Sequence, residues 1–230
     1  GCDEKMQNDY VDALICEIKL YGKRYKEQYE VDTIFVGGGT PSILLPSLIS
    51  KILIAVFESF SVKLDAEISI ESNPKTLTRE KLETYRAAGI NRLSIGAQSL
   101  DDSMLKKLGR IHTAEEFIET FNLAREAGFT NINVDLMFAI PGHTNKIWED
   151  TLSKIIKLNP EHISFYSLQI EEGTPLFDMF KNGTIEQISD DIDRKMYHAA
   201  IKRFSEAGYK HYEISNCSKK GFECRHNLKY

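Results

Sequence analysis

The chain has 230 residues, of which 42% are hydrophobic and 27% charged, with a formal net charge of -5 at pH 7. These values predict one large α/β domain, and they argue against a nucleic-acid binder or a basic membrane-surface protein. No apolar run is long enough to predict a transmembrane helix. The first residues carry no secretory signal pattern, so the sequence predicts a cytoplasmic protein.

The predicted elements begin with a helix over residues 4–29, because apolar residues recur there at helical spacing. Its aromatic residues are expected to face the core, and Cys16 is expected to be a small core residue. The four cysteines are too few and too scattered for a disulfide framework. Cys217 and Cys224 keep two readings: ligands of a bound group, or ordinary packed thiols.

Strands and helices then alternate along the chain. Strands are expected at 32–36, 66–71, 92–97, 132–138 and 162–168, with a short alternating stretch at 211–214. Helices are expected near 48–57, 78–88, from 101, from a capping box at Thr113, at 148–156 and at 190–207. This alternation predicts right-handed βαβ units and a parallel sheet.

Polar and apolar residues alternate within the predicted strands, as in Glu67-Ile68-Ser69-Ile70-Glu71. Because alternate residues point to opposite faces, one face of the sheet is apolar and the other polar. A doubly wound sheet buries both faces, and a closed eight-stranded barrel fills its interior with apolar layers. The alternation therefore favours an incomplete, wider barrel with a wet lumen that holds a polar ligand.

Candidate site residues follow successive strands at the end where α/β folds bind ligands. They are Gly38, Gly39, Thr40, Glu71, Gln98 and Asp135. Each one singly has an ordinary structural reading, since strand-end carboxylates often cap the next helix. Together, two carboxylates, an amide and a bare-backbone turn suit a ligand with ribose hydroxyls, an amine and a carboxylate.

Six motifs cover nearly the whole chain: VGGGTPS at 36–42, EISIESNP at 67–74, NRLSIGAQS at 91–99, LGRIH at 108–112, NVDLM at 133–137 and IPG at 140–142. In these motifs, and in their order, the sequence resembles the oxygen-independent coproporphyrinogen III oxidase family of radical S-adenosylmethionine (SAM) proteins. After Cys224, the residues His226, Asn227 and Tyr230 are similar to the HNxxYW signature of the family's heme-chaperone (HemW-like) branch, without the final Trp.

The resemblance implies an α/β fold, a partial (β/α)6 TIM-like barrel over residues 1–175, continuous with the start of a C-terminal α/β extension at 176–230. It implies a SAM site whose residues are Gly38, Gly39, Thr40, Glu71, Gln98, Arg110 and Asp135. In the oxidase branch, the positions of Gln98, Arg110 and Asp135 contact SAM or a second SAM. For Arg110, on a loop, a surface ion pair is the alternative. Catalytic residues stay unassigned.

The family's [4Fe-4S] cluster is held by a CxxxCxxC motif after the first barrel strand, and three thiolates leave one iron open for SAM. The chain contains no such motif. The first strand and the cluster cysteines are therefore expected upstream of Gly1, and no metal ligand is expected in this chain.

The heme-ligand candidate is His226, because imidazole is a common axial ligand of heme iron. Cys224 is a weaker alternative, and a solvated tail histidine is the plain reading of His226. The other histidines show no mutual ligand spacing and are expected to be structural or exposed; they are His112, His143, His162, His198 and His211.

For function, the resemblance implies a chaperone that binds heme and transfers it to acceptor proteins such as respiratory enzymes. It would meet membranes only through these acceptors, and nucleic acid is not expected as a partner. The alternative is an enzyme that oxidatively decarboxylates coproporphyrinogen III to protoporphyrinogen IX. A SAM-binding barrel with another radical substrate is the third reading. Whether the chain is an enzyme stays open.

Overall fold

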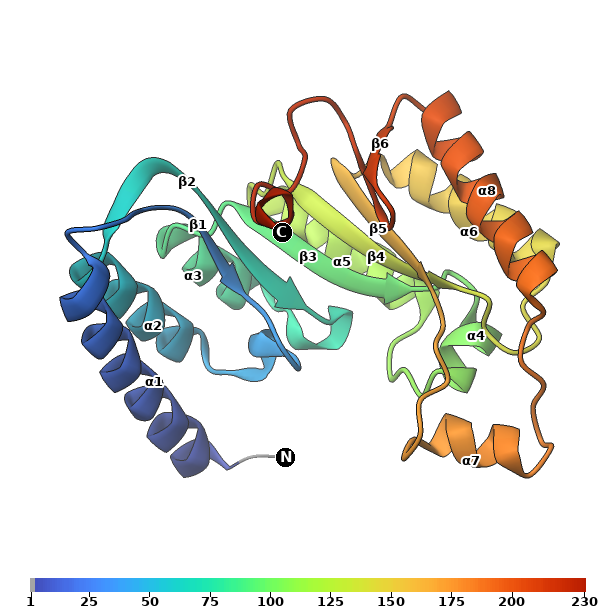
Figure 1. The fold of residues 1–230 in the computed structure, drawn as a ribbon, viewed down its shortest axis with the longest axis horizontal. Helices are drawn as coiled ribbons and strands as arrows, with labels where there is room; N and C mark the ends of the chain where they lie inside the picture. Colours follow the sequence, from blue (N-terminus) through green and yellow to red (C-terminus); the bar gives the residue numbers. More distant parts are fainter. Residues whose placement is uncertain (1–2) are drawn as a thin grey trace.

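The computed structural model describes residues 3–230 and contains a curled seven-stranded sheet (Figure 1). Its strands lie in the order β1-β2-β3-β4-β5-β7-β6. The first five are parallel to one another, and β7 is antiparallel to both of its neighbours. The strands are β1 Glu30–Val36, β2 Ser61–Ser72, β3 Arg92–Gln98, β4 Ile132–Phe138, β5 His162–Ser167, β6 Lys210–Glu213 and β7 Asn216–Ser218. The expected parallel strands and partial barrel are confirmed.

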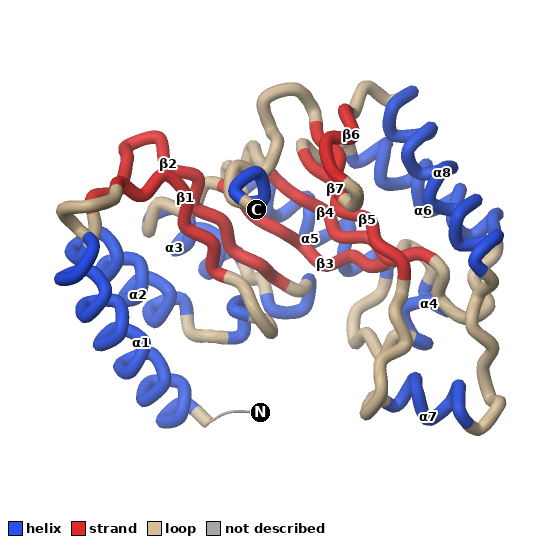
Figure 2. Tube along the Cα trace, in the orientation of Figure 1, coloured by secondary structure: helices blue, strands red, loops and turns tan. Residues whose placement is uncertain are grey.

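Helices α2 to α6 connect the parallel strands, α1 precedes β1, and α7 and α8 lie between β5 and β6. The helices are α1 Glu4–Tyr25, α2 Pro46–Ser59, α3 Arg79–Ala87, α4 Asp102–Lys107, α5 Ala114–Glu126, α6 Asn145–Leu158, α7 Pro175–Lys181 and α8 Asp190–Glu206 (Figure 2). The capping box predicted at Thr113 is present, since this hydroxyl accepts from the N–H of Glu116 and the Glu116 carboxylate accepts from the N–H of Thr113. None of the helices in the described part of the chain has the length and hydropathy needed to cross a bilayer.

The two faces of the sheet differ in polarity, as the alternation predicts. One face packs residues such as Ile70, Leu93 and Val134 into a single core with the buried faces of α2, α3, α5, α6 and α8. On the other face, the register sets Glu71 beside Ser94 and Ser94 beside Asn133. We call the space over this polar face the lumen.

The C-terminal residues return to the polar face. In Figure 1 the C-terminus lies in front of the sheet, beside β2 and β3. The segment from Cys224 to Tyr230, which ends in the 3-10 turn Asn227–Lys229, is held there by the buried carboxylate of Glu67 on β2. The lumen is therefore bounded by a segment far away in sequence.

Two elements were not predicted, α7 and β7. Helix α7 is a short helix that begins at Pro175 after a Thr174 cap, within a stretch without long periodicity. Strand β7 has three residues and is defined by its pairing with β5, with Cys217 opposite Ile163. Since β6 and β7 extend the same sheet, the boundary proposed at residue 175 stays a prediction.

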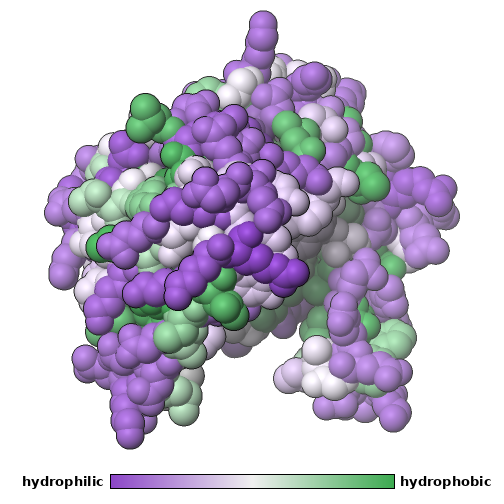
Figure 3. Space-filling model, turned by 60° about the vertical axis from the view of Figure 1, so that its left-hand side comes forward, coloured by the Kyte–Doolittle hydropathy of each residue, from purple (hydrophilic) through white to green (hydrophobic). Residues whose placement is uncertain are grey.

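The expectation that the aromatic residues of α1 and Cys16 lie in the core was wrong. Tyr10 and Tyr21 are 60% and 46% exposed, and Cys16 is exposed as well, whereas Leu14 and Ile18 pack against the core. The reason is that α1 packs on α2 at the outside of the fold, where it buries only Val11 and Gly22 completely. Hydrophobic patches accordingly interrupt the mostly hydrophilic surface on the side of α1 (Figure 3).

Candidate functional site

A small polar cavity of about 200 Å³ lies at the carboxyl ends of the parallel strands. It brings together six residues predicted to form a SAM site: Gly39, Thr40, Glu71, Gln98, Arg110 and Asp135. Its lining also includes Ser72, Asn73, Gly96 and Tyr166, which were not predicted as site residues. The remaining predicted SAM residue, Gly38, does not line the cavity, but its N–H donates to Glu71 Oε2, which does, at 3.0 Å.

The turn after β1 has the bare-backbone geometry that its glycines permit. Gly38 and Gly39 have φ of +85° and +64°, and a Cβ on either would meet nothing within 4 Å. The backbone of this turn is therefore open to a ligand, in a conformation that residues with a side chain rarely adopt. Beside the turn, Asn73 donates to Thr40 Oγ1 at 3.1 Å and accepts from Arg110 at 3.3 Å. Asn73 thus links two predicted site residues. Its position in the motif EISIESNP could have indicated it as a site residue.

The end of β3 aims Gln98 at the cavity through a backbone irregularity. The pairing with β4 shifts register between Gly96 and Gln98, and Gln98 has a left-handed φ of 63°. Such a conformation costs about 1–2 kcal/mol for a residue with a side chain, which is typical of binding sites. Tyr166 on β5 donates to Gln98 Oε1 at 3.1 Å, and burial raises the pKa of Tyr166 to about 12, so that it remains a donor.

Asp135 is oriented by two donors. Its Oδ1 accepts from Asn133 Nδ2 at 2.7 Å, and its Oδ2 accepts from Ser94 Oγ at 3.0 Å. Burial raises the pKa of Asp135, and these hydrogen bonds oppose that shift. Both oxygens are thereby held in place, and a carboxylate has further lone pairs that can accept from a ligand.

His226 lies outside this cavity, in the lumen over β1. Its ring stacks on Phe35 with centroids 4.9 Å apart, Nδ1 lies 3.3 Å from Thr33 Oγ1, and Nε2 lies 3.4 Å from the hydroxyl of Tyr230. Phe35 also reaches the glycine turn, because a Cβ on Gly37 would come within 2.7 Å of its ring. Phe35 therefore contacts both the heme-ligand candidate and the first glycine of the turn.

Cys224, the weaker heme-ligand candidate, is buried. Its Sγ lies 3.5 Å from Glu67 Oε1, and burial raises the pKa of the thiol. A protonated, enclosed thiol is a poor ligand, since the thiolate is the form that binds metals. That His226 is the stronger heme-ligand candidate stays a prediction.

The cavity fits part of a SAM-sized ligand. Its polar groups are two carboxylates, two amides, a guanidinium and an open backbone, and they suit ammonium, hydroxyl and carboxylate groups of a ligand. Its volume of about 200 Å³ is below the ~300 Å³ at which ligand pockets usually begin. Within residues 3–230, no three His, Cys, Asp or Glu side chains form a metal site. These residues do not fit the three thiolates of a cluster, and Cys2 lies outside the described residues.

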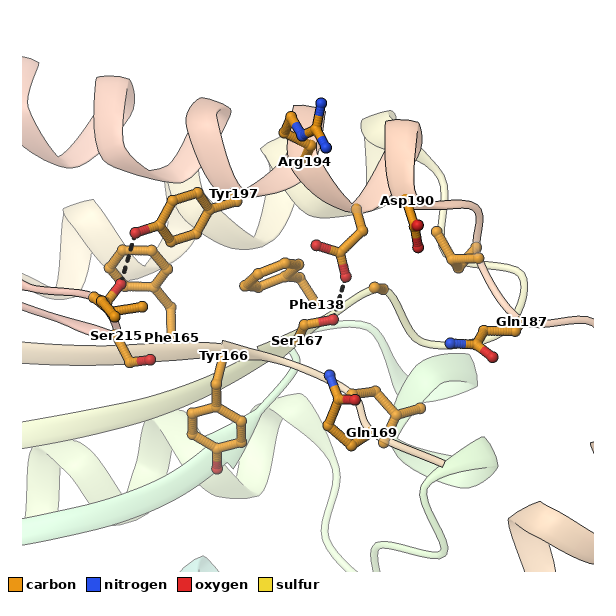
Figure 4. A pocket seen from close by; sticks show the side chains of 15 residues that line it. Phe138, Phe165, Tyr166, Ser167, Gln169, Gln187, Asp190, Arg194, Tyr197 and Ser215 are labelled. Carbon is orange, nitrogen blue, oxygen red and sulfur yellow. Dashed lines mark hydrogen bonds between the residues drawn. The ribbon is translucent and has the colours of Figure 1, made fainter. Parts of the chain in front are cut away.

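A second cavity of about 460 Å³ lies on the opposite side of β5, against α8. Figure 4 shows Phe138, Phe165 and Tyr197 on its side of the strand, while the ring of Tyr166 projects the other way. Ser167 donates to Asp193 at its edge. No predicted site residue lines this cavity. A third cavity of about 480 Å³, between β1 and the helices α1 and α2, includes Gly38 and Thr40. The lumen cavity is taken as the candidate site because it brings together six of the predicted residues.

The partial barrel and its lumen cavity define an α/β protein with a polar cavity at the carboxyl ends of parallel strands, the place where α/β folds bind ligands. The family model described as the Radical SAM superfamily matches residues 2–155. The chain belongs to this superfamily.

Among curated proteins, the chain is 37% identical over 204 residues to the heme chaperone HemW of Bacillus subtilis (strain 168), covering 88% of this chain and 54% of that protein. It is 36% identical over 227 residues to HemW of Escherichia coli (strain K12), covering 99% and 59%. The chain thus spans little more than half the length of these relatives. Among solved structures, the coproporphyrinogen III oxidase HemN of Escherichia coli matches with a TM-score of 0.86 and 27% identity, over 97% of this chain and 51% of that one.

Proposed function

We propose that this chain forms the SAM-binding and heme-binding part of a heme chaperone, which binds heme and passes it to acceptor proteins. The observation that carries the SAM assignment is the convergence of Gly39, Glu71, Gln98, Arg110 and Asp135 on one cavity. The heme assignment is supported by the similarity to HemW proteins over most of the chain. In this proposal the protein acts in the cytoplasm and meets membranes only through its acceptors.

The residues divide the binding of SAM among them. Glu71 and Asp135 are placed to accept from ammonium and hydroxyl groups, while the guanidinium of Arg110 and the open backbone at Gly39 are placed to donate to a carboxylate. A [4Fe-4S] cluster, which makes bound SAM a source of radicals, would need thiolates other than those of residues 3–230. The roles assigned to these residues are binding and orientation.

The second candidate is the oxidation of coproporphyrinogen III. It is supported by the structural match to HemN, which covers 97% of the chain. A chaperone and an oxidase of this kind would need the same SAM site, so the cavity does not distinguish the two functions. The similarity to HemW is higher in sequence, 36–37% against 27%, and favours the chaperone.

The test is a hemin titration of the full-length protein, followed by its Soret band, with a coproporphyrinogen III turnover assay in parallel. We expect saturable heme binding that His226→Ala weakens at least tenfold, and no turnover. His198→Ala, a change of an exposed histidine on α8, is the matched control and should bind heme as the wild type does. Turnover by a protein that does not bind heme would overturn the proposal in favour of the oxidase.

A further inference from the structure

A chain of hydrogen bonds, centred on two buried residues, runs through the lumen from β6 to the candidate SAM site. The hydroxyl of Tyr212 lies 2.7 Å from His162 Nε2, and His162 Nδ1 lies 2.6 Å from Asn133 Oδ1. Asn133 Nδ2 donates to Asp135 Oδ1 at 2.7 Å. His162 and Asn133 are 0% and 2% exposed, so water does not compete for the bond between them. None of the three residues before Asp135 lines the cavity.

The donors in this chain have one consistent direction. Asn133 uses both amide hydrogens, because Nδ2 also donates to Ser94 Oγ at 2.7 Å, and its Oδ1 must therefore accept from His162 Nδ1. Burial lowers the pKa of His162 well below its usual value, which keeps the ring neutral and makes Nε2 an acceptor. Burial raises the pKa of Tyr212 to about 12, so this hydroxyl donates to Nε2. Each donor thus points toward Asp135.

The first member of the chain is joined to the segment that carries His226. The backbone N–H of Cys224 donates to the oxygen of Tyr212 at 3.2 Å. The next two N–H groups, those of Arg225 and His226, both donate to the buried carboxylate of Glu67 at 3.2 Å. The segment is therefore held by Glu67 and Tyr212 together, and it cannot move as a unit without changing the bond to Tyr212.

Binding of a metal-centred ligand requires His226 to change its contacts. Its two ring nitrogens face Thr33 and Tyr230, and its ring stacks on Phe35. Ligation of an iron occupies one ring nitrogen, so at least one of these contacts is lost. The structure shows the arrangement in which His226 packs on Phe35, and a ligand on His226 would require this arrangement to change.

We propose that the chain Tyr212–His162–Asn133 couples the two sites: a ligand on His226 alters how Asp135 is held, and thereby alters the affinity of the cavity for SAM. Tyr212 and His162 are positioning residues in this proposal, which rests on the proposed binding of heme and SAM. Because coupling between two binding sites is reciprocal, SAM must change heme affinity by the same factor. Couplings of this kind are typically about 5–150-fold.

The experiment measures SAM affinity of the full-length protein by calorimetry with and without saturating hemin, and heme affinity with and without SAM. We expect each ligand to change the affinity of the other at least threefold and by equal factors. Tyr212→Phe should bind both ligands singly and lose most of the coupling factor. Tyr209→Phe is the matched control, since it removes a buried phenol that donates to Pro160 O at 2.7 Å outside the chain, and it should keep the coupling.

A second pair of variants guards against misfolding of Tyr212→Phe. His162→Gln retains a donor for Asn133 and an acceptor for Tyr212, and should keep part of the coupling, whereas His162→Leu should abolish it. A merely structural role would weaken binding of each ligand singly without selectively removing the coupling. Two independent binding events in the wild type, or full coupling in Tyr212→Phe, would overturn the inference and leave the proposed function intact. Failure of the wild type to bind either ligand would overturn both.

Discussion

Gly96 is the position where a single methyl group tests the geometry of the cavity most directly. A Cβ there would lie 2.9 Å from Gln98 Nε2 and 3.3 Å from Asn73 Oδ1. The first contact is too close, so in Gly96→Ala the amide of Gln98 must move, and its bond from Tyr166 is expected to break. We expect a folding cost of about 1 kcal/mol for overpacking against a flexible side chain and about 1 kcal/mol for the lost bond.

That total of about 2 kcal/mol corresponds to a fall in Tm of about 4–8 °C for a chain of this size. SAM affinity, measured by calorimetry, should fall at least tenfold, because the new methyl group and the displaced amide both occupy the cavity. The control is the same change in a Gln98→Ala background, where the close contact is gone and the added cost should nearly vanish. An equal cost in both backgrounds, or wild-type SAM affinity in Gly96→Ala, would refute the reasoning.

Two further predictions concern stability. Gly22→Ala places a Cβ 2.5 Å from Ser59 Cβ where α1 meets α2. We expect urea unfolding to show a loss of about 1–3 kcal/mol in stability, although Ala gains up to about 1 kcal/mol in helix propensity. A stabilised variant would contradict this packing. Burial lowers the pKa of His143 to about 4, against an opposing effect of Asp101. The unfolded state therefore protonates His143 more readily than the folded state does. As pH falls from about 6.5 to about 4, this difference should lower the free energy of unfolding by up to about 3 kcal/mol. His143→Leu should flatten that part of the stability–pH profile. An unchanged profile would count against a neutral, buried His143.

The sequence predicted the parts of the fold that repeat locally. The alternation in strands such as Glu67 to Glu71 is a property of neighbouring residues, and it correctly assigned a polar and an apolar face. The exposure of Tyr10 and Tyr21 was not predictable in the same way, because helical spacing shows that a helix has an apolar side without showing whether another element covers it. Similarly, β7 is a strand because β5 lies beside it.

In the candidate site, too, some residues were predictable from local sequence and others were not. Glu71, Gln98 and Asp135 were predictable because the carboxyl ends of parallel strands meet at one edge. The role of Glu67 in holding the C-terminal segment was not predictable, because its partners Arg225 and His226 lie 158 and 159 positions away in the sequence. Strand alternation places the Glu67 carboxylate in the lumen, where an unpaired buried charge is unfavourable. The C-terminal N–H groups satisfy that charge, so the same carboxylate that makes the lumen polar also fixes the position of the heme-ligand candidate.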